Sequence, residues 1–165
     1  DLSDTQEIRL TSEPGESADA RFSPDGRTIV FVRKAIQSEE GNARIMASPE
    51  IWTMSADGGN RQRLTDGKAW DYQPVWSPDG TQLAFISSRS EGYDNLFVMK
   101  ADGSEVQQLT KQDYRKKMSP VWSKDGEFLF YMSEESYKRK LHAVSLESRE
   151  IVEITDSCVE FALTE

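Results

Sequence analysis

Few side chains in this sequence could carry out covalent chemistry. His142 is the only histidine and Cys158 the only cysteine. A serine hydrolase needs a nucleophile and a base within hydrogen-bond reach, and the Gly-x-Ser-x-Gly pattern that presents such a serine is absent. Its nearest match, residues 15–19, ends in Asp19 where the closing glycine would stand. We therefore expect no catalytic residue, no histidine-based metal site and no cofactor.

Aspartates recur at turn-like positions, and Asp-rich loops can hold calcium. Asp25, Asp79 and Asp125 lie in three separate turns with one carboxylate each. An aspartate in a turn accepts hydrogen bonds from its own backbone, which explains its presence without a metal. Asp57 and Asp102 follow the same logic. The pattern therefore predicts turn chemistry and no metal site.

These turns belong to an internal repeat. Residues 22–26 read Phe-Ser-Pro-Asp-Gly, 76–80 read the same with Trp first, and 122–126 read Trp-Ser-Lys-Asp-Gly. A Leu-Thr or Ile-Thr pair closes each unit, and an additional copy stands near the start. The threonines of these pairs are Thr11, Thr65, Thr110 and Thr155. A spacing of roughly 45 residues is typical of stacked supersecondary units that bury their faces only against neighbours.

Each repeat contains four strand-like segments, best seen in the second unit at 74–76, 83–86, 96–99 and 106–110. The second segment is apolar throughout, which indicates burial on both faces. The fourth is polar and alternating, as expected of an outer strand. Four antiparallel strands with this period are typical of a β-propeller blade, and a β-sandwich is the main alternative.

We therefore expect an all-β fold, a β-propeller fragment of about three four-stranded antiparallel blades with partial strands at both ends. Residues 34–49, the extra length of the first unit, are expected to form a long loop or one short helical turn. His142 stands where the other repeats have Trp52 and Phe97, which indicates a packed or rim imidazole. The expected bounds are 7–11 for an orphan strand, 12–65, 66–110 and 111–155 for the blades, and 156–165 for the start of a further blade.

These motifs resemble the TolB-type propeller repeat, whose Pro-x-Trp-Ser-Pro-Asp-Gly pattern stands at 74–80. Similar repeats form the propeller domains of the prolyl oligopeptidase family. The resemblance implies a fold more than a function, because unrelated roles are found on propellers. Resemblance to TolB implies a periplasmic location, with a cytoplasmic one as the alternative. The third repeat departs from the pattern at Lys124, Glu134 and 146–148.

Composition excludes two classes of partner. The formal net charge is −9, whereas nucleic-acid binders concentrate positive charge. No run of 18 apolar residues exists, so no segment is expected to insert into a membrane. The remaining expectation is a protein or peptide partner.

The predicted topology places the repeated turns on one face and the variable loops on the other, and binding usually resides on variable loops. The variable loops are expected at 34–49, 66–73, 88–94, 111–119 and 134–139. They gather the aromatic and cationic residues that dominate interface energetics. Arg89 and Asp94 flank one loop at a spacing that indicates a bracing ion pair. An acidic patch of a partner would complement residues 115–117. The candidate binding residues are Trp70, Tyr72, Arg89, Tyr93, Asp94, Tyr114, Arg115 and Tyr137.

Two functions remain open on these grounds. The first is a non-catalytic module that binds a protein or peptide through its variable-loop face. The second is the propeller part of a serine peptidase whose catalytic domain lies elsewhere. Exposed blade faces and strand edges also predict self-association, or packing against further blades.

Overall fold

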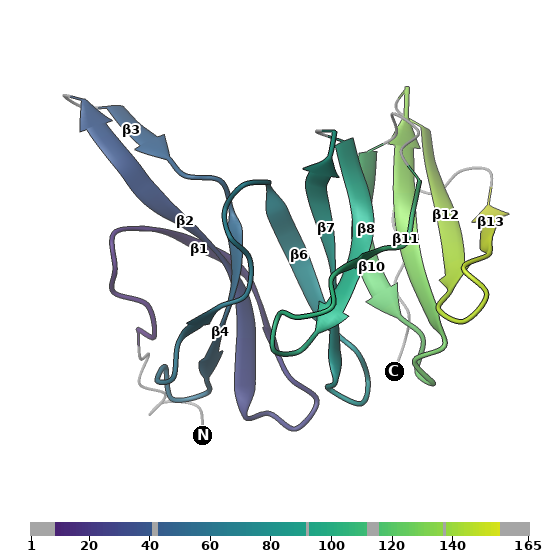
Figure 1. The fold of residues 1–165 in the computed structure, drawn as a ribbon, viewed down its shortest axis with the longest axis horizontal. Coiled ribbons are helices and arrows are strands. Elements are labelled where there is room, and N and C mark those ends of the chain that lie inside the picture. The colour runs from purple at the N-terminus through teal and green to yellow at the C-terminus, as the bar shows by residue number, and fades with distance from the viewer. Residues whose placement is uncertain (1–8, 41–42, 92, 112–115, 137, 156–165) are drawn as a thin grey trace, which may run out of the picture.

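The computed structural model describes residues 9–40, 43–91, 93–111, 116–136 and 138–155. Within these ranges the chain forms three antiparallel sheets that stand side by side (Figure 1), and no helix. The described residues therefore contain no helix long and apolar enough to cross a membrane. The expected all-β partial propeller is confirmed.

Each sheet is a meander whose strands pair in chain order, and we call the sheets blades 1, 2 and 3. Blade 1 has an additional strand, β3, paired with β2. Blade 1 contains β1 (Gly15–Phe22), β2 (Thr28–Glu40), β3 (Ala43–Met46), β4 (Glu50–Ser55) and β5 (Gln62–Arg63). Blade 2 contains β6 (Asp71–Trp76), β7 (Gln82–Ser90), β8 (Tyr93–Lys100) and β9 (Gln107–Gln108). Blade 3 contains β10 (Lys116–Trp122), β11 (Phe128–Glu135), β12 (Lys138–Ser145) and β13 (Ile151–Thr155).

The repeated turn is built by a serine and an aspartate. In blade 2 the Ser77 hydroxyl donates to Asp79 Oδ1 over 2.6 Å and accepts from the Gln82 amide over 2.9 Å. Asp79 Oδ1 also accepts from the Thr81 amide, and Gly80 takes a φ of 71°. The pairs Ser23–Asp25 and Ser123–Asp125 repeat this network. Lys124 in place of proline does not alter it, so the third repeat keeps the turn.

The hydrogen bonds of the repeated turn make the stability of the fold depend on pH. The hydrogen bond from Ser77 is the main cause that lowers the pKa of Asp79 below its usual value of 3.8. A carboxyl with a lowered pKa in the folded state stabilises it above pH 3.8, and this contribution disappears as the pH falls through the lowered pKa.

Asp79→Asn should therefore lower the urea midpoint at neutral pH and should show a smaller fall in midpoint on acidification than the native chain. Urea unfolding followed at pH 7 and at successively lower pH measures both. The two curves should converge once Asp79 of the native chain is protonated. Parallel curves across the whole range would contradict the role given to this turn.

The threonines that close the first two repeats each satisfy a backbone amide of the third strand of their blade. Thr65 Oγ1 accepts from the Ile51 amide over 2.9 Å, and Thr110 Oγ1 accepts from the Leu96 amide over 3.0 Å. The outer strands β5 and β9 are only two residues long. The hydroxyl therefore extends the pairing beyond the point where the outer strand ends, which explains why this landmark recurs.

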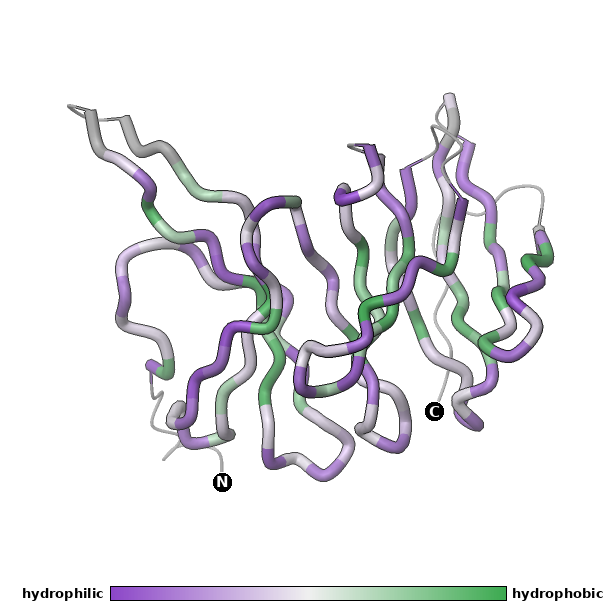
Figure 2. Tube along the Cα trace, viewed as in Figure 1, coloured by the Kyte–Doolittle hydropathy of each residue, from purple (hydrophilic) through white to green (hydrophobic). Residues whose placement is uncertain are grey.

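The core lies between the blades. In β7, Leu83 and Phe85 pack toward blade 1, whereas Ala84 and Ile86 pack toward blade 3. All four side chains are fully buried, and this two-sided burial is why the strand is apolar throughout. Figure 2 shows hydrophobic residues along the middle of the strands and hydrophilic ones toward the loops.

Hydrogen bonds along the innermost strands join one blade to the next. The Trp76 and Trp122 indoles donate to the carbonyls of Arg21 and Val75 in the preceding blades. A second ladder runs through a bulge in each inner strand, where Asp19, Gln73 and Ser119 all have φ between 52° and 54°. The Gln73 amide donates to the Asp19 carboxylate, and the Ser119 amide donates to the Gln73 side chain. These bonds fix the relative position of the blades.

The structure corrects the expected loops. Residues 34–49 were expected as a loop or helical turn, but β2 continues to Glu40 and pairs with β3 in a long hairpin at the upper left of Figure 1. The expected loops 66–73, 88–94, 111–119 and 134–139 are shorter than expected, because β6, β7, β8, β10, β11 and β12 extend into them. Apolar runs predict only the buried middle of a strand, and the paired polar ends were missed. The full blade bounds stay predictions, since residues 156–165 lie outside the described ranges.

Candidate binding surface

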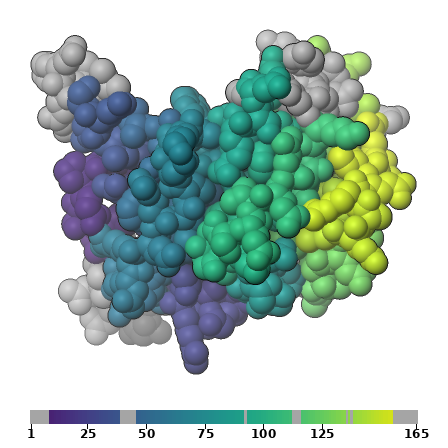
Figure 3. Space-filling model, in the orientation of Figure 1, coloured from purple at the N-terminus to yellow at the C-terminus, as the bar shows by residue number. Residues whose placement is uncertain are grey.

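Five of the eight candidate residues lie together at the variable-loop end of blade 2. They come from the start of β6 and from the β7–β8 hairpin, which reaches the upper edge of the molecule (Figures 1 and 3). We call this group the blade-2 rim: Trp70, Tyr72, Arg89, Tyr93 and Asp94. The other three candidates, Tyr114, Arg115 and Tyr137, lie outside the described residues.

Arg89 is held by four contacts on the face of blade 2 that looks toward blade 1. Its Nη2 donates to Asp71 Oδ1 over 2.9 Å, and its Nε donates to Ser87 Oγ over 2.9 Å. Its guanidinium also lies 5.1 Å from the ring centre of Phe85 and 5.2 Å from that of Phe97. Asp71 is fully buried, whereas the Arg89 side chain keeps 28% of its surface exposed. The arginine is therefore positioned rigidly and is still partly accessible.

Arg89 does not pair with Asp94, so the expected bracing ion pair is wrong. Side chains alternate between the faces of a strand, and Arg89 lies with Asp71 on one face of blade 2. Asp94 lies on the other face beside Tyr72. Burial, followed by the hydrogen bond to Asp94 and by its charge, raises the pKa of the Tyr72 phenol well above its usual range. Tyr72 therefore serves as a neutral hydrogen-bond donor to Asp94 near neutral pH.

Trp70 is a large exposed aromatic residue on a fixed backbone. Trp70 is 61% exposed. Its amide donates to Ser88 Oγ, and its carbonyl accepts from the Ser88 amide, both over 3.0 Å. An aromatic side chain presented in this way loses little conformational entropy on binding, which favours recognition.

Sequence reasoning missed Asp71 and misplaced Lys117. Asp71 was counted within a loop, although it begins β6 and its Oδ2 is buried without a hydrogen-bond partner among the described residues. Lys117 was expected to meet an acidic partner with residues 115 and 116, but it is only 1% exposed within β10. A charged residue directly before an aromatic residue was the available signal for Asp71, and no comparable signal marked Lys117, which precedes Met118.

His142 is packed inside the protein. Its Nε2 lies 2.8 Å from Ser133 Oγ, and its ring stacks on Tyr131 with centres 5.0 Å apart. Ser133 is 3% exposed and His142 is 5% exposed. A buried serine cannot reach a substrate carbonyl without opening the sheet, so this pair serves packing. Within the described ranges, no group of three His, Cys, Asp or Glu side chains is arranged to hold a metal.

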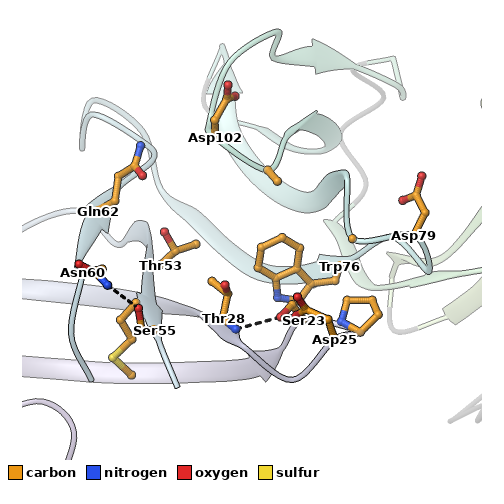
Figure 4. A pocket seen from close by; sticks show the side chains of 14 residues that line it. Ser23, Asp25, Thr28, Thr53, Ser55, Asn60, Gln62, Trp76, Asp79 and Asp102 are labelled. Atoms are coloured by element: carbon orange, nitrogen blue, oxygen red, sulfur yellow. Dashed lines mark hydrogen bonds between the residues drawn. The ribbon is translucent and has the colours of Figure 1, made fainter. Parts of the chain in front are cut away.

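Two hollows lie away from the blade-2 rim. A groove of about 1070 Å³ runs along the inner strands of the three blades and includes Phe22, Trp76 and Trp122. A pocket of about 550 Å³ lies between blades 1 and 2 at the end that carries the repeated turns (Figure 4). The concave surfaces and the exposed Trp70 therefore belong to different parts of the molecule.

Comparison with known families supports the architecture. The sequence profile of the family described as TolB beta propeller domain matches residues 43–162. Among solved structures, TolB from Acinetobacter baumannii superposes with a TM-score of 0.68 at 24% identity, covering 95% of this chain and 37% of that one. At this identity the likeness shows the fold alone.

Two curated relatives are longer than this chain. An uncharacterized peptidase, YuxL of Bacillus subtilis, is 33% identical over 109 residues, which is 66% of this chain and 16% of the relative. An uncharacterized protein of Agrobacterium fabrum, Atu1656, is 29% identical over 141 residues, covering 80% of this chain and 45% of the relative. The chain thus spans less than half the length of either protein.

Proposed function

The chain belongs to the TolB beta propeller domain family, and from this premise we propose that it is a non-catalytic module that binds a protein or peptide through the blade-2 rim. The observation that carries the proposal is the presentation of Trp70, an exposed aromatic on a hydrogen-bonded backbone. Interfaces are dominated by a few aromatic and arginine residues, and Arg89 supplies a partly accessible guanidinium at the same rim.

The chemistry of the rim favours a peptide with an apolar or aromatic side chain. Trp70 offers a flat apolar surface, whereas the guanidinium of Arg89 is already engaged by Asp71 and Ser87. A partner carboxylate would therefore have to share the Arg89 guanidinium with Asp71 and Ser87, so it would gain less than from an unpaired arginine. We expect the partner's anchor to lie against Trp70, with polar contacts to Arg89 and Tyr93 around it.

The matched residue for a test is Phe22, which is 63% exposed and lies at the opposite end near the inner groove. Peptides selected from a display library against the 165-residue chain serve as probes. Trp70→Ala should weaken their binding by roughly 30-fold, the loss typical of a hot-spot aromatic. Phe22→Ala should leave the affinity unchanged. The reverse order of effects would place binding in the groove and would contradict the proposal.

A second function is favoured by one of the relatives. The Bacillus relative is named a peptidase, and this chain covers only 16% of it. The chain would then be the propeller portion of a serine peptidase that gates or positions substrate. A Gly-x-Ser-x-Gly segment encoded downstream of Glu165 would favour this function, whereas further blades alone would favour the binding module.

Under either function the chain alone should not hydrolyse peptides or esters. Ser133 and His142 are buried, and the sequence contains no nucleophile elbow. Turnover of a chromogenic ester and of a peptide substrate should equal the buffer blank. Activity that co-purifies with the chain and disappears in His142→Ala would overturn this expectation.

A further inference from the structure

A pocket lies between blades 1 and 2, at the first of the two interfaces between the blades. It is lined by Thr28, Thr53 and Gln62 from blade 1 and by Trp76 and Ala101 from blade 2 (Figure 4). Its volume is about 550 Å³. It lies at the turn-bearing end of the blades, away from the blade-2 rim, so it is independent of the proposed function.

The neighbouring interface shows why the pocket exists. Thr53 in blade 1 and Val98 in blade 2 occupy equivalent positions, because Thr53 pairs with Val30 and Val98 pairs with Ala84. Ala101 after β8 in blade 2 and Leu146 after β12 in blade 3 are also equivalent. The Ala101 amide donates to the Thr81 carbonyl, and the Leu146 amide donates to the Glu127 carbonyl. Thus Thr53 and Ala101 at the first interface correspond to Val98 and Leu146 at the second. Val98 and Leu146 both pack in the apolar core between blades 2 and 3, so smaller or polar residues leave space at the first interface.

The lining offers hydrogen-bond acceptors that no described residue uses. Thr53 is only 7% exposed, and its hydroxyl makes no hydrogen bond within the described part of the chain. Figure 4 shows this hydroxyl on the side of Gln62. The Thr28 hydroxyl and the Gln62 amide are likewise without a partner among the described residues. Because Thr53 lines the pocket, its hydroxyl can accept a hydrogen bond from a ligand that enters.

Carboxylates surround the opening. Asp25, Asp79 and Asp102 all line the pocket, and each comes from a different turn. In each case a hydrogen bond from a serine hydroxyl is the main cause that lowers the pKa of the carboxyl. The three stay ionised at neutral pH, so the opening is negatively charged. Because the described lining contains these three carboxylates and no Lys or Arg, the pocket favours a cation over an anion.

Trp76 adds an aromatic wall. Its indole stands beside Thr28 and Ser23 in Figure 4, and its nitrogen is fixed by the Arg21 carbonyl at 3.3 Å. A fixed indole can hold a cation above its face. A planar guanidinium combines stacking with five hydrogen-bond donors, whereas an ammonium is a compact point charge. The combination of acceptors, carboxylates and an indole therefore fits a guanidinium better than an ammonium.

We propose that the pocket between blades 1 and 2 binds the guanidinium group of an arginine side chain from a peptide partner. The guanidinium donates to the Thr53 and Thr28 hydroxyls and to the Gln62 carbonyl oxygen, and it lies against the Trp76 indole. The carboxylates at the opening attract the cation and hold it by charge. This site recognises one side chain, whereas the blade-2 rim is a separate surface.

The probe is N-acetyl-arginine methylamide, titrated into the 15N-labelled chain and followed by amide chemical shifts. Shifts should concentrate on Thr28, Thr53 and Gln62. N-acetyl-citrulline methylamide keeps the shape but lacks the charge, so it should bind at least about tenfold more weakly. Equal shifts with the two probes, or no shifts with arginine at saturating solubility, would overturn the proposal.

Two variants locate the site. Ala101→Leu places at the first interface the side chain that fills the second, and it should abolish binding of the arginine probe. Thr53→Val conserves size and should weaken binding about threefold or more, since one hydrogen bond to a charged group is lost. Retention of the native spectrum and melting temperature verifies folding of each variant.

Trp70→Ala should leave binding of the arginine probe unchanged, so failure of this site and failure of the rim can be told apart. Undiminished binding of the arginine probe to Ala101→Leu would show that the guanidinium lies elsewhere. A Trp70→Ala variant that lost the probe would place it at the blade-2 rim, which would also refute the pocket.

Discussion

Arg89→Ala should lower the free energy of unfolding by about 3–5 kcal/mol, because it leaves the carboxylate of Asp71 buried without a counter-charge. Asp71 is completely buried, and one of its two oxygens already lacks a partner among the described residues. The arginine is also the cover of the Phe85 and Phe97 rings. Removal of the Arg89 side chain therefore exposes the Phe85 and Phe97 rings and leaves the Asp71 charge without a counter-charge.

Urea unfolding of Arg89→Ala measures this effect, and two comparisons interpret it. Arg89→Met combined with Asp71→Leu removes both charges and should recover much of the loss, because replacing a buried pair by apolar residues is often neutral. Lys68→Ala removes an exposed pair with Asp66 whose side chains are 86% and 55% exposed, and it should have no measurable effect. An Arg89→Ala variant as stable as Lys68→Ala would contradict the geometry.

Phe85→Ala should cost about 3–5 kcal/mol, the range typical of a buried phenylalanine truncated to alanine. Phe85 is fully buried between blades 1 and 2, and its ring stacks on Phe97 with centres 5.7 Å apart. Its loss creates a cavity at the interface and removes the support beneath Arg89. Thermal and urea unfolding both report the change.

Phe130→Ala is the matched control, because Phe130 is only half-buried and lies outside the core clusters between the blades. Its truncation should cost clearly less than that of Phe85. A Phe130→Ala variant at least as destabilised as Phe85→Ala would mean that the faces between the blades do not carry the stability assigned to them.

Much of the architecture was predictable from the sequence, because the repeated motifs form hydrogen bonds at short, fixed spacings along the chain. Ser77 and Asp79 form their turn from neighbouring backbone groups alone, so the turn can be recognised from its residues. Thr110 recurs because it satisfies a neighbouring strand at a fixed spacing. An apolar segment such as 83–86, buried on both faces, indicates a blade between two others.

Contacts between distant residues were harder to predict. The Asp71–Arg89 pair depends on β6 and β7 continuing past their apolar middle. Asp71 then pairs with Ser87 in the register, and Arg89, 18 residues after Asp71, lies on the same face of blade 2. Arg89 and Asp94 are closer in sequence, but alternation places them on opposite faces. The pocket depends on Thr53 and Ala101, whose significance appears only when the two blade interfaces are compared.

A chemical-shift footprint shows whether a peptide partner binds at the blade-2 rim. A display-selected peptide is titrated into the 15N-labelled chain, and the perturbed amides are mapped onto the blades. We predict perturbations at Trp70, Arg89 and Tyr93. Perturbations confined to the repeated turns or to the groove that includes Phe22 and Trp122 would contradict the claim.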